Sequence, residues 1–196
     1  MLDMVTAAGW PIWPMIAASV VALAIILERL FSLRRSVVAP AGVLDQAIAC
    51  GRASGNLDEL ERSPLGRVLG AGIRNRGGSP EDMKQAVEET GRAVAHDLSR
   101  YLTTLGSIAS MAPYLGLFGT VVGMIEIFAA QSPSGGGDPA QLAHGISVAL
   151  YNTAFGLIVA IPSMVFYRHF RAQIDAYLVD MEQQAIHLVD AMNKGR

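Results

Sequence analysis

Three long apolar runs constrain this chain of 196 residues more than any other feature of its sequence. They cover residues 9–27, 101–125 and 139–167. A helix needs about 20 apolar residues to cross the hydrocarbon core of a bilayer, and each run is long enough. Outside the runs, charged residues return in clusters. We therefore predict an all-α membrane protein with three spanning helices and long helices that extend beyond the membrane.

The positions of the basic residues predict an orientation. All 15 lysines and arginines lie between Arg29 and Arg100 or between Arg168 and Arg196. With three spans, these two stretches lie on the same side of the membrane. Loops rich in Lys and Arg stay in the cytoplasm. We therefore expect a cytoplasmic C-terminus, with the N-terminus and the second connection on the outside.

Six segments follow from these runs. Residues 1–35 hold the N-terminus and the first span, with Trp10 and Trp13 suited to the outer interface. The others are a cytoplasmic helical region (36–100), the second span (101–130), a short Gly-rich outer loop (131–140), the third span (141–168) and a C-terminal cytoplasmic helix (169–196).

Helix signals extend two of the spans into the cytoplasm. Ser79-Pro80-Glu81-Asp82 has a cap residue, a proline at the first helical position and acids in the first turn. No glycine-rich or proline breaker is evident before Met111, so we predict one helix from Pro80 to about Ala130, roughly 75 Å long. After the third span, an apolar seam recurs every three or four residues and predicts packing against other helices. Its members are Phe170, Ile174, Tyr177, Met181, Ala185, Leu188 and Met192.

Composition argues against several functions. A net charge of −2 gives no electrostatic support for binding nucleic acid. The single cysteine, Cys50, excludes an internal disulfide and any multi-cysteine metal centre. The four histidines are scattered, and no phosphate-binding loop or nucleophile–base pattern is present. We predict no enzyme activity, no metal and no cofactor.

Small and polar residues form a stripe on each of the last two spans. Small residues let helices approach closely in lipid, and we expect these positions to pack helices together. They are Gly116, Gly119 and Gly123 on the second span, and Gly145, Ala149, Gly156 and Ala160 on the third. Packing does not require the polar residues nearby, which are candidates for an ion pathway: Thr120, Glu126, Asn152 and Thr153. A threonine can also bond back to the carbonyl four residues earlier, which is a purely structural role.

The two membrane motifs, GLFGTVVGM and GISVALYNTAFGLIVAIPS, resemble the second and third spans of the ExbB/TolQ proteins and, more distantly, MotA. The resemblance extends over nearly the whole chain. It implies a subunit of a pentameric ring in the bacterial inner membrane, with a periplasmic N-terminus. The ring encloses a single-span partner like ExbD or TolR, and a TonB-like or TolA-like protein is a further candidate partner. Proton flow is coupled to work on the cell envelope.

The resemblance also assigns roles to individual residues. It implies that Thr120 and Thr153 face the inner cavity of the ring, and that Pro162 lies near the cytoplasmic end of the third span. The family usually has a glutamate where this chain has Val148. Glu126 and Asn152 are the candidates to compensate for it.

Two other readings remain open. A non-conducting scaffold for a single-span partner explains the small residues and the valine. A small-solute transporter is disfavoured because the chain has no internal repeat.

Overall fold

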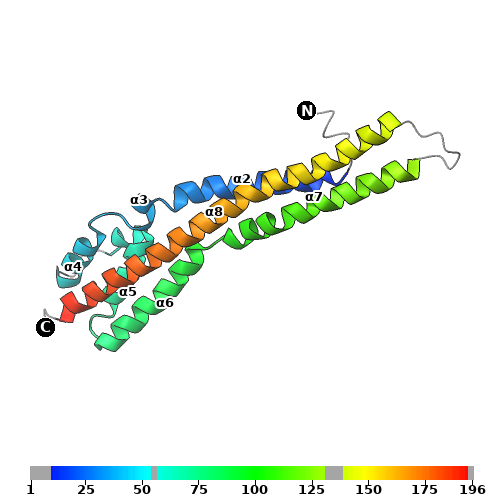
Figure 1. Ribbon diagram of the computed structural model, residues 1–196. Coiled ribbons are helices and arrows are strands. Elements are labelled where there is room, and N and C mark those ends of the chain that lie inside the picture. The colour runs from blue at the N-terminus through cyan, green and yellow to red at the C-terminus, as the bar shows by residue number, and fades with distance from the viewer. Residues whose placement is uncertain (1–9, 54–56, 131–138, 194–196) are drawn as a thin grey trace. The chain divides into compact units, whose positions relative to one another are not determined.

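The computed structural model describes residues 10–53, 57–130 and 139–193. Every regular element in these ranges is a helix, which confirms the predicted all-α fold (Figure 1). Residues 131–138, which make up most of the predicted outer loop, and the first nine residues lie outside the described ranges.

The chain divides into two compact units, which we call the membrane unit and the charged unit. The membrane unit comprises Met1–Leu27 and Tyr101–Arg168, and the charged unit comprises Glu28–Arg100 and His169–Arg196. Helices α2 and α8 each contribute residues to both units.

Three helices are long and apolar enough to span a bilayer, as predicted. They are α2 (Ile12–Ser32), α7 (Leu102–Ala130) and α8 (Pro139–Asn193). Pro113 lies inside α7 and Pro162 inside α8, and neither ends its helix. Ile12 and Met15, near the start of α2, pack with Leu115 of α7 and Phe155 of α8.

The prediction of one helix from Pro80 to about Ala130 is wrong. The structure has two helices, α6 (Pro80–Leu98) and α7, which begins at Leu102. Between them, Tyr101 has a φ of 63°, in the left-handed region. A residue with a Cβ is uncommon there, and none can continue a right-handed helix in that conformation.

A distant side chain caps the end of α6. The buried guanidinium of Arg29 donates from Nη1 to the carbonyl oxygen of Leu98 at 3.0 Å. It also pairs with Glu28, next to it in the sequence. The last carbonyls of a helix have no partner within the helix, so this bond stabilises the end of α6 at Leu98.

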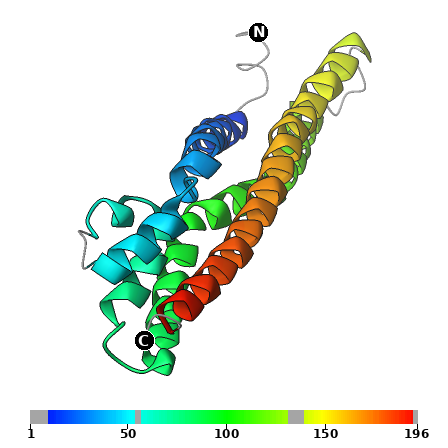
Figure 2. The same cartoon turned by 90° about the vertical axis from the view of Figure 1, so that its left-hand side faces the viewer.

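Serine caps begin two helices of the charged unit. Ser63 accepts a hydrogen bond from the backbone N–H of Gly66 at the start of α5 (Pro64–Arg74). Ser79 and Asp82 form a reciprocal capping box at the start of α6, which confirms the predicted helix start. Helix α5 packs against α6 and against α4 (Val43–Ala53) (Figure 2). The two shortest elements are α3 (Arg35–Val38) and the 3-10 helix η1 (Leu60–Arg62).

The predicted apolar seam of α8 forms the core of the charged unit. Phe170 and Leu188 are fully buried, and Met192 is half-buried at its end. The hydroxyl of Tyr177, a member of the seam, donates to the carbonyl oxygen of Leu33 at 2.8 Å, and Nε2 of Gln173 donates to the same oxygen at 3.1 Å. Since Leu33 follows directly after α2, these bonds fix the end of α2 to α8 within this unit.

Candidate functional site

Helices α7 and α8 of the membrane unit contact each other backbone to backbone. A Cβ on Gly156 would lie 2.6 Å from the carbonyl oxygen of Ala112 and 3.1 Å from Cα of Gly116. A Cβ on Gly116 would lie 2.8 Å from the carbonyl oxygen of Asn152. Neither helix can carry a larger residue at this point unless the two backbones separate. The two glycines therefore bring the helices within reach of each other's carbonyl groups.

The same interface continues along both helices. A Cβ on Gly119 would lie 2.9 Å from Cβ of Asn152, and one on Gly123 would lie 3.1 Å from Cβ of Ala149. A Cβ on Gly145 would lie 2.7 Å from Cγ1 of Ile127. Residue numbers rise along α7 as those of their partners fall along α8, so the helices are antiparallel. The structure brings together all five glycines of the two stripes in one interface.

Thr120 and Thr153 lie against each other in this interface. Their hydroxyl oxygens are 2.5 Å apart, and both residues are half-buried. Thr120 is also 3.2 Å from the carbonyl oxygens of Gly116 and Ala149, and Thr153 is 3.2 Å from that of Gly116. One carbonyl of α7 and one of α8 thus flank the two hydroxyls.

The hydroxyl pair can exchange protons without carrying charge. Each hydroxyl has one proton to donate and two lone pairs to accept with. Four oxygens therefore share two protons, and rotation of either hydroxyl reverses the direction of a bond. The arrangement can relay a proton. It can equally stabilise the helix pair, because interhelical hydrogen bonds act as structural contacts in lipid.

Among the described side chains of α8 in this unit, the buried polar ones are Asn152 and Ser163. Asn152 is 1% exposed and packs against Gly119. Ser163, also 1% exposed, donates to the carbonyl oxygen of Val159 at 2.7 Å. Ser163 was not among the residues predicted from the sequence. Its spacing of seven residues from Gly156 places it on the interface side of α8, and this was the available signal.

Glu126 lies apart from the threonines. It is exposed, and no hydrogen bond or ion pair of its side chain occurs among the described residues. Val148 is half-buried. Both residues follow an interface glycine by three positions, Gly123 on α7 and Gly145 on α8. A step of three residues turns both helices by the same angle. Because the helices are antiparallel, this turn places Glu126 and Val148 on the same side of the helix pair. The contacts of Gly123 and Gly145 set Glu126 level with Ile146, about 3 Å along the axis from Val148.

The remaining predicted residues lie toward the other end of the pair. Ala160 is buried and clusters with Ala112 and Val159, whereas Pro162 is exposed. Within the described residues, no group of three or more His, Cys, Asp or Glu side chains is placed to hold a metal ion.

The two helices of this interface lie largely within a stretch of the chain that matches a known family. Residues 60–183, which include α6, α7 and most of α8, match the model of the MotA/TolQ/ExbB proton channel family. This chain belongs to that family. It is accordingly a multi-pass membrane protein.

Relatives within the family are ExbB proteins. The biopolymer transport protein ExbB of Salmonella typhimurium is 35% identical over 183 residues, covering 83% of this chain and 72% of that protein. ExbB of Helicobacter pylori is 46% identical over 79 residues, covering 40% of this chain and 54% of that protein. ExbB of Aquifex aeolicus is 38% identical over 91 residues, covering 46% of this chain and 60% of that protein.

Proposed function

We propose that this protein is a ring-forming subunit of an ExbB-type complex that uses the proton-motive force. The observation that carries the proposal is the pair of touching hydroxyls, Thr120 and Thr153, inside a glycine-lined interface of two membrane helices. Packing of the helices needs the glycines but not the hydroxyls. The ring, a pentamer by resemblance, encloses a single-span partner like ExbD or TolR. A TonB-like or TolA-like protein receives the work.

In this mechanism protons enter from the outer side of the bacterial inner membrane and protonate a carboxylate of the partner helix. The partner carboxylate faces Thr120 and Thr153, whose hydroxyls exchange hydrogen bonds as the proton passes to the cytoplasm. Each event shifts the ring relative to the enclosed helices. Lys and Arg cluster in the sequence before the second span and after the third, two stretches that lie on the same side of the membrane. This clustering supports an outer N-terminus and a cytoplasmic C-terminus.

Glu126 supplies the carboxylate that the family usually carries at the position of Val148. It is the only acid in residues 101–130 and 141–168, and an acid inside a span is costly, so it usually marks a functional position. The position of Glu126 supports this substitution. It lies on the same side of the helix pair as Val148, about 3 Å from it along the helix axis. Asn152, buried against Gly119, can donate and accept hydrogen bonds but cannot titrate. Glu126 is therefore the stronger substitute.

A non-conducting scaffold is the alternative function. It is favoured by the carbonyl oxygens beside both threonines, which satisfy the hydroxyls without any transported ion. In that case the interface only packs two helices, and the chain holds a single-span partner in place.

The two functions are separated by the variants Thr153→Val and Thr153→Ser. The assay is proton uptake by proteoliposomes that contain the chain with its single-span partner. For the conducting ring, Thr153→Val abolishes uptake and Thr153→Ser retains it, while both assemble as the wild type does. Ser147→Ala is the control, since Ser147 is exposed on α8 and bonds only within its own helix, to the carbonyl of Ala143. Normal uptake by Thr153→Val would remove the hydroxyl relay and leave the scaffold.

A further inference from the structure

Exposed apolar side chains form a stripe along α2 that continues into its last turn. Its members recur every three or four residues and are between 40% and 63% exposed: Val20, Leu23, Leu27, Leu30 and Phe31. Residues at this spacing share one face of a helix. Because α2 is apolar and long enough to span a bilayer, this face is suited to acyl chains, and Phe31 marks its end.

Arg34 continues the stripe just beyond α2. It follows Phe31 by three residues, and its guanidinium carbon lies 4.7 Å from the centre of the Phe31 ring. An aromatic face attracts a cation but does not neutralise its charge. No hydrogen bond or ion pair of the Arg34 side chain occurs among the described residues. The guanidinium can therefore donate to an acceptor from outside the chain.

Positive charge predominates around the end of α2. Arg29 donates to the carbonyl oxygen of Leu98, and Gln173 donates to that of Leu33. Three stretches of the charged unit therefore meet here, namely residues 28–37, 98–100 and 169–174. They contain five arginines and one acid, Glu28, which pairs with Arg29. Asp180 lies 3.8 Å from Arg35, whose side chain is nevertheless 78% exposed.

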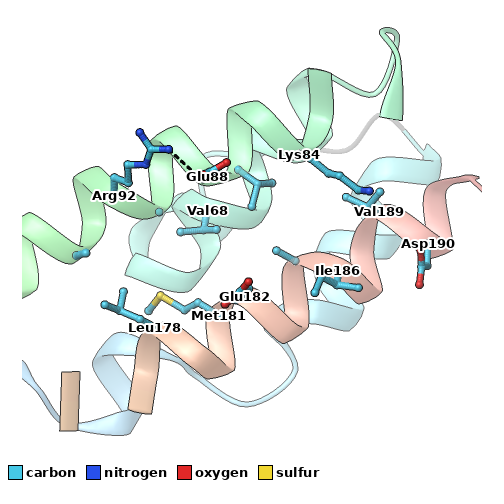
Figure 3. A pocket seen from close by; sticks show the side chains of 14 residues that line it. Val68, Lys84, Glu88, Arg92, Leu178, Met181, Glu182, Ile186, Val189 and Asp190 are labelled. Atoms are coloured by element: carbon cyan, nitrogen blue, oxygen red, sulfur yellow. Dashed lines mark hydrogen bonds and ion pairs between the residues drawn. The ribbon is translucent and has the colours of Figure 1, made fainter. Parts of the chain in front are cut away.

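The groove between α6 and α8 of the same unit has a different balance of charge (Figure 3). Its lining has two cations, Lys84 and Arg92, and three acids, Glu88, Glu182 and Asp190. Arg92 pairs with Glu88 at 2.5 Å. The groove is therefore poorly suited to an anion. At the end of α2, by contrast, an arginine without an acidic partner among the described residues lies beside an exposed aromatic ring.

We propose that Arg34 binds the phosphate of an anionic phospholipid in the leaflet that α2 reaches at its C-terminal end. Phe31 packs on the upper part of the acyl chains, and Arg35 adds positive charge from the next position. Basic residues directly beside a span attract anionic lipids, and a guanidinium can donate two parallel hydrogen bonds to a phosphate. Another copy of the chain would bring the same arginines to this depth, and like charges disfavour such a contact.

The test is quenching of a single tryptophan by brominated lipids in vesicles. The full chain carries Trp10→Phe, Trp13→Phe and Phe31→Trp, so that its one tryptophan reports which lipid lies beside Arg34. Brominated phosphatidylglycerol and brominated phosphatidylcholine are compared in vesicles of phosphatidylcholine. We expect phosphatidylglycerol to bind at least about fivefold more tightly. Adding Arg34→Gln should lower this preference about fivefold, which corresponds to the roughly 1 kcal/mol expected for one arginine near an anionic surface.

Two controls separate this site from a general effect of charge. A chain with Trp10→Phe alone keeps Trp13, which is 63% exposed at the other end of α2 and should show no preference. Arg52→Gln removes one charge from an exposed position of α4 and should leave the preference at Phe31→Trp unchanged.

Equal quenching of the Phe31→Trp chain by the two lipids would overturn the proposal, as would a preference that survives Arg34→Gln. A third result would also refute it, namely no quenching by either lipid while Trp13 is quenched. In that case a protein, and not lipid, covers the end of the stripe.

Discussion

In the membrane unit, α7 and α8 meet backbone to backbone, whereas in the charged unit α8 meets its neighbours through large side chains. The atoms nearest a Cβ on Gly156 are backbone atoms of Ala112 and Gly116. In the charged unit, the atoms nearest a Cβ on Gly72 belong to the side chains of Val87 and Leu188. Phe170 and Leu188 are fully buried there.

The difference follows from the solvent. Lipid is as apolar as a leucine side chain, so burying one leucine against another gains little in a membrane. Close packing and hydrogen bonds must hold the helices together instead. In water, burial of apolar surface is itself favourable, and polar helix ends need caps. The two units of one chain thus follow the two sets of rules.

Phe170→Ala should have the largest effect on stability. Its side chain is fully buried in the charged unit, and such a truncation costs about 3–5 kcal/mol. Unfolding in detergent, followed by hydrogen exchange of α6 and of the C-terminal part of α8, measures the loss. Val37→Ala is the control, since Val37 is exposed in the same unit, and it should change little. An equally small effect of Phe170→Ala would mean that side-chain burial does not hold this unit together.

Gly156→Ala tests the membrane unit with a single added methyl group. The new Cβ meets backbone atoms that cannot rotate away, and we expect a destabilisation of about 1–3 kcal/mol. The readout is denaturant unfolding in detergent. In the charged unit, the Cβ of Gly91→Ala meets open space, and this substitution should stabilise the protein by up to about 1 kcal/mol. Effects of equal sign at the two glycines would remove the contrast between the units.

The smallest of these effects concerns the cap of α6. Ser79→Ala removes the hydroxyl that accepts from the backbone N–H of Asp82, at a cost of about 1 kcal/mol. Hydrogen exchange at the first turn of α6 checks it. Ser36→Ala, which alters an exposed serine of the same unit, is the control.

The cap is also sensitive to pH. Hydrogen bonds from the backbone and side chain of Ser79 hold the pKa of the Asp82 carboxyl below its usual 3.8. Because the folded pKa is the lower one, the stabilisation is fully present above about pH 3.8 and is lost as the pH falls through the folded value. Asp82→Asn should remove this dependence. A carboxyl resonance of Asp82 that titrates at its ordinary pKa would contradict the role of the cap.

Much of the fold was predictable because its signals are local. Apolar length predicted the three spans, Ser79 and Pro80 predicted the start of α6, and three- and four-residue spacing predicted the buried seam from Phe170 to Leu188. The end of α6 was not predictable in this way. Arg29, 69 residues away in the sequence, donates to Leu98, and Tyr101 adopts a left-handed conformation without being glycine or asparagine. Tertiary contacts decide the break.

The candidate site was also predictable only in part. Glycine spacing indicated the α7–α8 interface, and the motifs singled out Thr120 and Thr153. The sequence does not reveal the register between the helices, because it depends on which glycine meets which carbonyl. That register brings the two hydroxyls to 2.5 Å and leaves Glu126 exposed. Ser163 could have been found from its spacing of seven residues from Gly156, whereas Arg29, a single basic residue beside an apolar run, gives no periodic signal.

The contact of Gly116 with Gly156 has a mechanical consequence. Side chains between two helices can change rotamer and let one helix slide or roll, but a backbone contact has no such freedom. The second and third spans therefore behave as a single stiff strut. Any displacement that accompanies a transport cycle must take place at the outer surfaces of this strut, where it meets α2, lipid or another polypeptide.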